Sequence, residues 1–97
     1  MNIVAVTACP TGIAHTYMAA EKLEQTAKDL GHSIRVETQG AMGIENELSE
    51  EDIAKADVAI IAADIAVEKA DRFDHVKKIE VPVQQILKDA AGVFSRI

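Results

Sequence analysis

The amino-acid sequence predicts an α/β fold, a three-layer sandwich with a four-stranded parallel sheet between two layers of helices. Short apolar runs rich in β-branched residues alternate along the chain with segments whose apolar residues recur every three or four positions, which is the pattern of strand–helix–strand units. The third run is apolar after its first residue, as in a strand that is covered on both faces. The 97 residues fit a single domain, residues 1–97.

Four segments have the composition of strands: residues 2–8 (NIVAVTA), 33–39 (SIRVETQ), 57–63 (DVAIIAA) and 78–82 (KIEVP). Right-handed crossovers would place these strands in the order 2-1-3-4, a flavodoxin-like or Rossmann-like arrangement. In such sheets ligands bind outside the carboxyl ends of the strands, at the point where the strand order reverses. Here that point lies between the first and third strands.

A long helix is predicted over residues 13–30, because its apolar residues lie three and four positions apart and its charged residues fall on the other side. Gly31 stands where a helix C-cap belongs. A short helix is expected to run to about residue 56, since Ser49 and Asp52 have the spacing of a capping box.

Pro82 begins the last predicted helix, whose apolar stripe extends to Phe94. Two segments are expected to be loops. Residues 40–48 (GAMGIENEL) contain two glycines, and residues 64–78 carry a weak signal with one helical turn around residues 67–70.

Composition excludes several classes of function. The net charge is −6, which disfavours nucleic acid and anionic membranes as partners. The single cysteine cannot form an internal disulfide, so an intracellular setting is expected. The sequence contains no apolar stretch long enough to insert into a membrane and no signal peptide. It also has no metal-ligand spacing among its cysteine and histidines and no Walker motif, so neither a metal nor a nucleotide cofactor is expected.

The stretch CPTGIAHT, at the end of the first strand, is the candidate site. Pro10 keeps Cys9 extended, and Gly12 permits close approach of the backbone to a ligand. The helix that follows begins with amides that have no intrahelical partner, and its dipole favours an anion there. That anion is either the Cys9 thiolate or a phosphoryl group carried by its sulfur. The candidate loop comprises Pro10, Thr11, Gly12, Ile13, Ala14, His15 and Thr16.

Each of these residues also has a plainer interpretation. Cys9 could be a small apolar residue that ends a core strand. His15 either donates a hydrogen bond to a phosphoryl oxygen or lies on the surface, and Thr16 is expected to face the core. Asp64, which leaves the third strand beside Cys9, is interpreted as a loop or cap residue, because a carboxylate would repel a phosphoryl group.

Three stretches closely resemble the fructose-family EIIB domain of the bacterial sugar phosphotransferase system (PTS). They are VAVTACPTGIAHTYMAAEKLE, VETQGAMGIENELSEEDIAKADVAIIAAD and RF. The resemblance implies that Cys9 takes a phosphoryl group from a phosphohistidine of the EIIA domain. Cys9 then passes the group to a sugar, by default fructose, bound by the membrane EIIC domain. It further implies no metal, a cytoplasmic location at the inner face of the membrane through EIIC, and possible membership of a longer permease.

Two alternatives stay open. A low-molecular-weight phosphatase would place Cys-x5-Arg in the same loop, but His15 occupies the position of the arginine. A regulatory module would bind an anion at this loop without a covalent step.

Overall fold

The computed structural model describes residues 1–9, 13–40 and 43–97, and nothing below refers to the residues between these ranges. Strands and helices alternate along the chain except that β3 directly follows β2, and the described part contains one 3₁₀ helix (η1). Their bounds are β1 Asn2–Ala8, α1 Ile13–Asp29, β2 Ser33–Gly40, β3 Gly43–Glu45, α2 Glu50–Ala54, β4 Val58–Ala63, η1 Ala70–Phe73, β5 Lys78–Val81 and α3 Val83–Phe94.

The sheet has the order β3-β2-β1-β4-β5. β2, β1, β4 and β5 are parallel, so the four predicted strands and their order are confirmed. The prediction of a loop over residues 40–48 was wrong for Gly43–Glu45, because β3 pairs antiparallel with β2. This strand of three residues contains one apolar side chain, Ile44, and is too short to show a periodic pattern.

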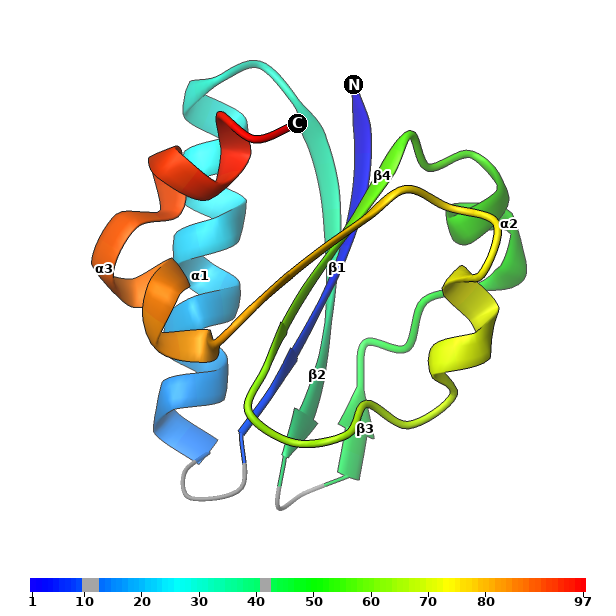
Figure 1. Ribbon diagram of the computed structural model, residues 1–97, viewed down its shortest axis with the longest axis horizontal. Coiled ribbons are helices and arrows are strands. Elements are labelled where there is room, and N and C mark those ends of the chain that lie inside the picture. Colours follow the sequence, from blue (N-terminus) through cyan, green and yellow to red (C-terminus); the bar gives the residue numbers. More distant parts are fainter. Residues whose placement is uncertain (10–12, 41–42) are drawn as a thin grey trace.

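Helices cover both faces of the sheet, which confirms the three-layer sandwich (Figure 1). α1 and α3 lie side by side on one face and bury apolar residues of every parallel strand, among them Ala5, Val36 and Ile60. α2 and η1 cover the other face, where Phe73 packs with Val6 and Ile61. This second helical layer is thin, since α2 has five residues and η1 has four.

The ends of the helices follow the predicted signals in most places. Gly31 has φ +79° after α1, and the capping box of α2 is formed by reciprocal hydrogen bonds between Ser49 and Asp52. The helical turn predicted at residues 67–70 lies instead at Ala70–Phe73. α3 is not continuous, because Asp89 has φ −156° and ψ 70° and its Oδ1 accepts a hydrogen bond from the Gly92 amide at 3.0 Å.

The chain termini and the carboxyl ends of the parallel strands lie at opposite ends of the sheet. Figure 1 shows both chain termini at one end and the carboxyl ends of β1 and β2, with the start of α1, at the other. Among the helices in the described ranges, none has the length and apolar character that crossing a membrane requires.

Candidate functional site

Cys9 directly follows β1, at the carboxyl edge of the sheet and at the predicted point where the strand order reverses. Its side chain is 6% exposed and belongs to the core that β1 shares with α1. This burial is compatible both with a core residue and with a sheltered nucleophile. The surrounding groups therefore decide what this edge can do chemically.

The amino end of α1 points at this edge (Figure 1). The hydroxyl of Thr7 donates a hydrogen bond of 3.1 Å to the carbonyl oxygen of Thr16, which fixes the first turn of α1 to β1. Both side chains are fully buried, at 0% and 1% exposed, so Thr16 faces the core as predicted. The first turn of α1 carries no acidic residue. An anion near Cys9 would therefore meet the positive end of the helix dipole without a competing carboxylate from this turn.

The structure places only part of the predicted loop. Ala14 and His15 lie on α1 with exposed side chains, and Ile13 begins the helix. Pro10, Thr11 and Gly12 lie outside the described residues, so their predicted contacts with an anion stay predictions. The described residues contain no group of three His, Cys, Asp or Glu side chains that could hold a metal ion.

A buried hydroxyl on the α1 side of β2 was not predicted as part of the site. Thr38 pairs with Thr7 across the sheet and is 3% exposed. Its Oγ1 has no hydrogen-bond partner in the described part of the chain. Two residues further along β2, Gly40 lies close to Thr16, because a Cβ on Gly40 would be 3.8 Å from the Thr16 hydroxyl. The end of β2 therefore lies near the start of α1.

Asp64 begins a segment that continues from β4 beside Cys9. Its amide donates a hydrogen bond of 3.0 Å to the carbonyl of Ala8, the residue before Cys9. Its Oδ1 accepts a hydrogen bond of 3.2 Å from the amide of Val83 at the start of α3. The interpretation of Asp64 as a cap residue is thereby confirmed. We call residues 64–69 the strap, because they run from the end of β4 past the end of β1 toward β2.

The far end of the strap is fixed to β2 by Gln39. Its amide nitrogen donates to the carbonyl of Glu68 at 3.1 Å, and its amide oxygen accepts from the Glu68 amide at 2.8 Å. Gln39 pairs with Ala8 in the sheet, so it lies beside the residue that precedes Cys9. Its side chain points to the face opposite α1.

Glu37 and Arg72 stabilise the contact between Gln39 and the strap. Arg72 donates two hydrogen bonds of 2.9 Å to the two carboxylate oxygens of Glu37, which is 0% exposed. Glu37 also accepts from Gln39 at 2.7 Å and from the Leu48 amide at 3.0 Å. Burial raises the pKa of Glu37, but the hydrogen bonds from these donors and the charge of Arg72 outweigh it and hold the pKa below its usual value.

Tyr17 connects α1 to the β2–β3 hairpin. Its hydroxyl donates a hydrogen bond to Oε1 of Glu45 on β3. This bond, then desolvation and the negative charge of Glu45, raises the pKa of Tyr17 above its usual value. The contact ties the edge strand to the helix whose amino end faces Cys9. Sequence reasoning found no role for Tyr17, Glu37, Gln39 or Arg72, although all four lie in the stretches that carry the family resemblance.

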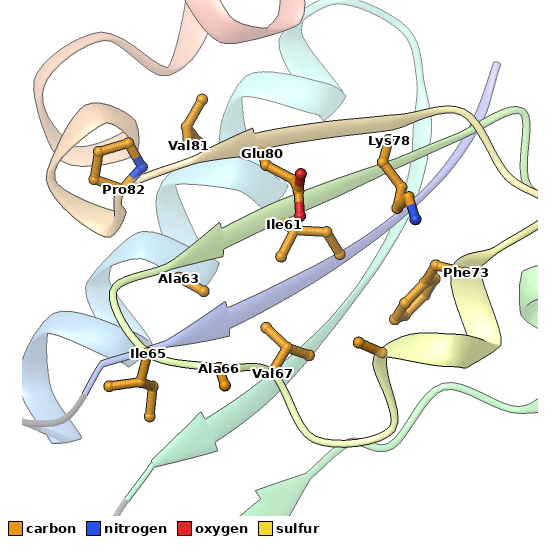
Figure 2. A pocket seen from close by; sticks show the side chains of 11 residues that line it. Ile61, Ala63, Ile65, Ala66, Val67, Phe73, Lys78, Glu80, Val81 and Pro82 are labelled. Carbon is orange, nitrogen blue, oxygen red and sulfur yellow. The ribbon is translucent and has the colours of Figure 1, made fainter.

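A pocket of about 430 Å³ lies between the strap and strands β4 and β5 (Figure 2). Ile61, Val67 and Phe73 form its apolar part, and Lys78 and Glu80 of β5 stand at its border. Cys9 does not line it, so it is a separate feature from the candidate site.

Comparison with known proteins gives consistent matches over almost the whole chain. The family model "PTS system, Lactose/Cellobiose specific IIB subunit" matches residues 4–96. The "PTS system fructose-like EIIB component 2" of Escherichia coli strain K12 is 48% identical over 99% of this chain and 91% of its own length. The "Fructose-like PTS system EIIBC component" of the same strain is 50% identical over 100% of this chain, which spans 20% of that protein.

Solved structures agree with these matches. The crystal structure of a predicted fructose-specific IIB from Escherichia coli has a TM-score of 0.94 at 44% identity, covering 98% of this chain and 84% of that one. A domain of the fructose-specific IIABC component of Borrelia burgdorferi has a TM-score of 0.92 at 47% identity, covering 97% of this chain and 89% of that one.

Proposed function

Because the chain belongs to the fructose-type EIIB family of the sugar phosphotransferase system and is a phosphoryl-transfer component, we propose that Cys9 is the residue that carries the phosphoryl group. The observation that supports this proposal is the position of Cys9 between the carboxyl end of β1 and the amino end of α1. A thiolate and a phosphoryl group are both anions, and both are stabilised at such a helix end.

The reaction has two steps. In the first, the Cys9 sulfur attacks the phosphorus of a phosphohistidine on EIIA, an S–P bond forms, and the P–N bond breaks to leave the histidine with its electron pair. In the second, a sugar hydroxyl attacks the same phosphorus, the S–P bond breaks, and the thiolate returns as the hydroxyl proton leaves. Backbone amides at the start of α1 would spread the charge on the transferred group in both steps.

Fructose is the proposed sugar. The relatives named above are described as fructose-like or fructose-specific, and so is the "PTS system fructose-specific EIIB'BC component" of Vibrio cholerae, which is 54% identical over 97% of this chain. The description of the matching family model instead names lactose and cellobiose. We give more weight to the individual relatives, because those named here agree on one sugar in their descriptions.

The proposed partners are a phosphorylated EIIA domain and a membrane EIIC domain. Fusion of EIIB and EIIC in the matching EIIBC protein supports the second partner. By the same argument the domain would work at the cytoplasmic face of the membrane, held there by EIIC, as a free protein or as one module of a longer permease.

The deciding experiment measures the intact mass of the domain after mixing with EIIA that has been phosphorylated by its upstream donors. Wild type should gain the mass of one phosphoryl group and keep it under denaturing conditions, whereas Cys9→Ser should fold and gain nothing. An adduct on Cys9→Ser would contradict the assignment of Cys9. Hydrolysis of a phosphoester analogue by the domain alone would instead indicate a phosphatase.

A further inference from the structure

The strap passes around the end of β1 on the face opposite α1. It begins at Asp64, whose amide is bonded to Ala8, and it is next held at Glu68 by Gln39 of β2. Because β1 lies between β4 and β2, the chain between these two points must cross the end of β1. Figure 2 shows Ile65, Ala66 and Val67 along this path. Cys9 therefore follows a strand that has the start of α1 on one side and the strap on the other.

Most of the strap is exposed: Asp64, Glu68 and Lys69 are charged, and Ile65 is its one large exposed apolar side chain. Ile65 is 44% exposed, whereas Val67 packs into the core beneath, against the cluster that contains Phe73. Ile65 follows Asp64, whose amide is bonded to the residue before Cys9, so a protein that docks over this edge can cover its apolar side chain. An EIIA domain that brings its phosphohistidine to Cys9 must cover this edge of the sheet.

The position of Ile65 depends on polar side chains that do not face Cys9. Gln39 holds both backbone groups of Glu68, so it fixes the strap much as a neighbouring strand would. Arg72 donates to the carbonyl groups of Glu68 and Lys69, at 3.3 and 2.8 Å, while its guanidinium is held by the buried Glu37. Glu37 in turn accepts from the amide of Gln39. These bonds connect the strap to β2 through one closed network.

We propose that Gln39, supported by Glu37 and Arg72, is a positioning residue for phosphoryl transfer, because it holds the strap so that Ile65 contacts the phosphorylated EIIA domain. The inference rests on the proposed function of Cys9. Gln39 acts on docking and not on the reacting atoms, since its side chain lies on the other face of the sheet from Cys9. Loss of its bonds should therefore weaken the encounter with EIIA and leave the chemical step unchanged.

The test follows the rate of Cys9 phosphorylation in single turnovers at increasing concentrations of phosphorylated EIIA. Gln39→Met keeps the length of the side chain and removes both bonds to Glu68. In this variant only about a tenth of the molecules should hold the strap against β2. The half-saturating EIIA concentration should then rise about tenfold, because only that fraction is ready to bind. The maximum rate constant should stay within about twofold of wild type. Hydrogen exchange at the Glu68 amide should become faster, which verifies that the strap has been released.

Ser49→Ala is the matched control, because it removes the cap of α2 and touches no strap residue. It should change neither the half-saturating EIIA concentration nor the maximum rate constant. A loss of folded protein would only lower the total amount of domain that becomes phosphorylated. An unchanged half-saturating concentration in Gln39→Met, with faster exchange at Glu68, would overturn the proposal. A large fall in the maximum rate constant alone would also overturn it.

Ile65→Ser provides a second test that does not depend on the folding of a core variant, because this side chain is largely exposed. It should raise the half-saturating EIIA concentration. In the double variant with Gln39→Met, the fold increase in this concentration should be smaller than the product of the two single increases, because both changes affect the same contact. A half-saturating concentration equal to that of wild type would exclude Ile65 from the docking contact. Failure of the proposed function of Cys9 would look different from failure of this inference. In that case wild type would gain no phosphoryl group at any EIIA concentration.

Discussion

Arg72 and Glu37 meet through two parallel hydrogen bonds of 2.9 Å, Nη1 to Oε1 and Nη2 to Oε2. The carboxylate is fully buried and the guanidinium side chain is 17% exposed. Such a pair is geometrically specific, because the planar guanidinium matches the two oxygens. It joins β2 to η1, two elements that are far apart in the sequence.

Removal of Arg72 alone should be strongly destabilising. Arg72→Met leaves the charge of Glu37 buried without its main partner, and the free energy of unfolding in urea should fall by about 3–5 kcal/mol. The double variant Glu37→Leu/Arg72→Met removes both charges and should recover a large part of this loss. If the double variant were as unstable as the single one, the cost would come from packing and not from the unpaired carboxylate.

The same pair predicts a dependence of stability on pH. The pKa of Glu37 in the folded protein lies below its usual value of 4.5, so its contribution is fully present above that value. The contribution is lost as the pH falls through the lower folded pKa. The unfolding free energy of wild type should therefore fall more steeply with acid below about pH 4.5 than that of Glu37→Leu/Arg72→Met. Other carboxylates titrate in both proteins, so parallel curves would contradict the lowered pKa.

The bond between Tyr17 and Glu45 can be tested by optical titration. Tyr17 is the only tyrosine and the chain has no tryptophan, so absorbance of the tyrosinate reports one residue. Its titration midpoint should lie above 10.0, because the hydrogen bond to Glu45 and the nearby negative charge oppose ionisation. Glu45→Ala should bring the midpoint back toward that value. Equal midpoints in the two proteins would show that the side chains do not meet in solution.

Thr38 offers a stabilising substitution at the candidate site. Thr38→Val has nearly the same shape and removes a buried hydroxyl that has no partner within the described ranges, so the unfolding free energy should rise by about 1 kcal/mol. Phosphorylation by EIIA should proceed as in wild type. A loss of stability would indicate that the hydroxyl is hydrogen-bonded in solution, and a loss of transfer would assign it to the phosphoryl group.

The strands and their order could be predicted because parallel strands buried on both faces are apolar over consecutive residues, as in Val58–Ala63. The position of Cys9 followed from that order. The network of the strap could not be predicted, because alternation along β2 places Glu37 and Gln39 on a polar side that would ordinarily face solvent. Their partners are distant in the sequence: Arg72 is 35 residues from Glu37, and Glu68 is 29 residues from Gln39. Such long-range pairs leave no periodic pattern in the sequence.

The kink in α3 has a related explanation. Apolar residues at helical spacing predict one helix, and the buried residues Val83, Ile86, Ala90, Val93 and Phe94 do follow that spacing. The interruption comes from Asp89, which uses its carboxylate to accept from the amide of Gly92. Asp and Asn compete with helical hydrogen bonding in this way, but their presence alone does not determine where a helix breaks.

Both chain termini lie at the end of the sheet remote from Cys9 (Figure 1). A polypeptide joined to either terminus would consequently extend away from the edge with Cys9 and leave this edge accessible to a partner domain. In a fused protein such a tether would raise the effective concentration of the domain near its neighbour without occupying the surface that the neighbour must reach. The domain could then rotate about its attachment point and present the same edge to a donor and an acceptor in turn.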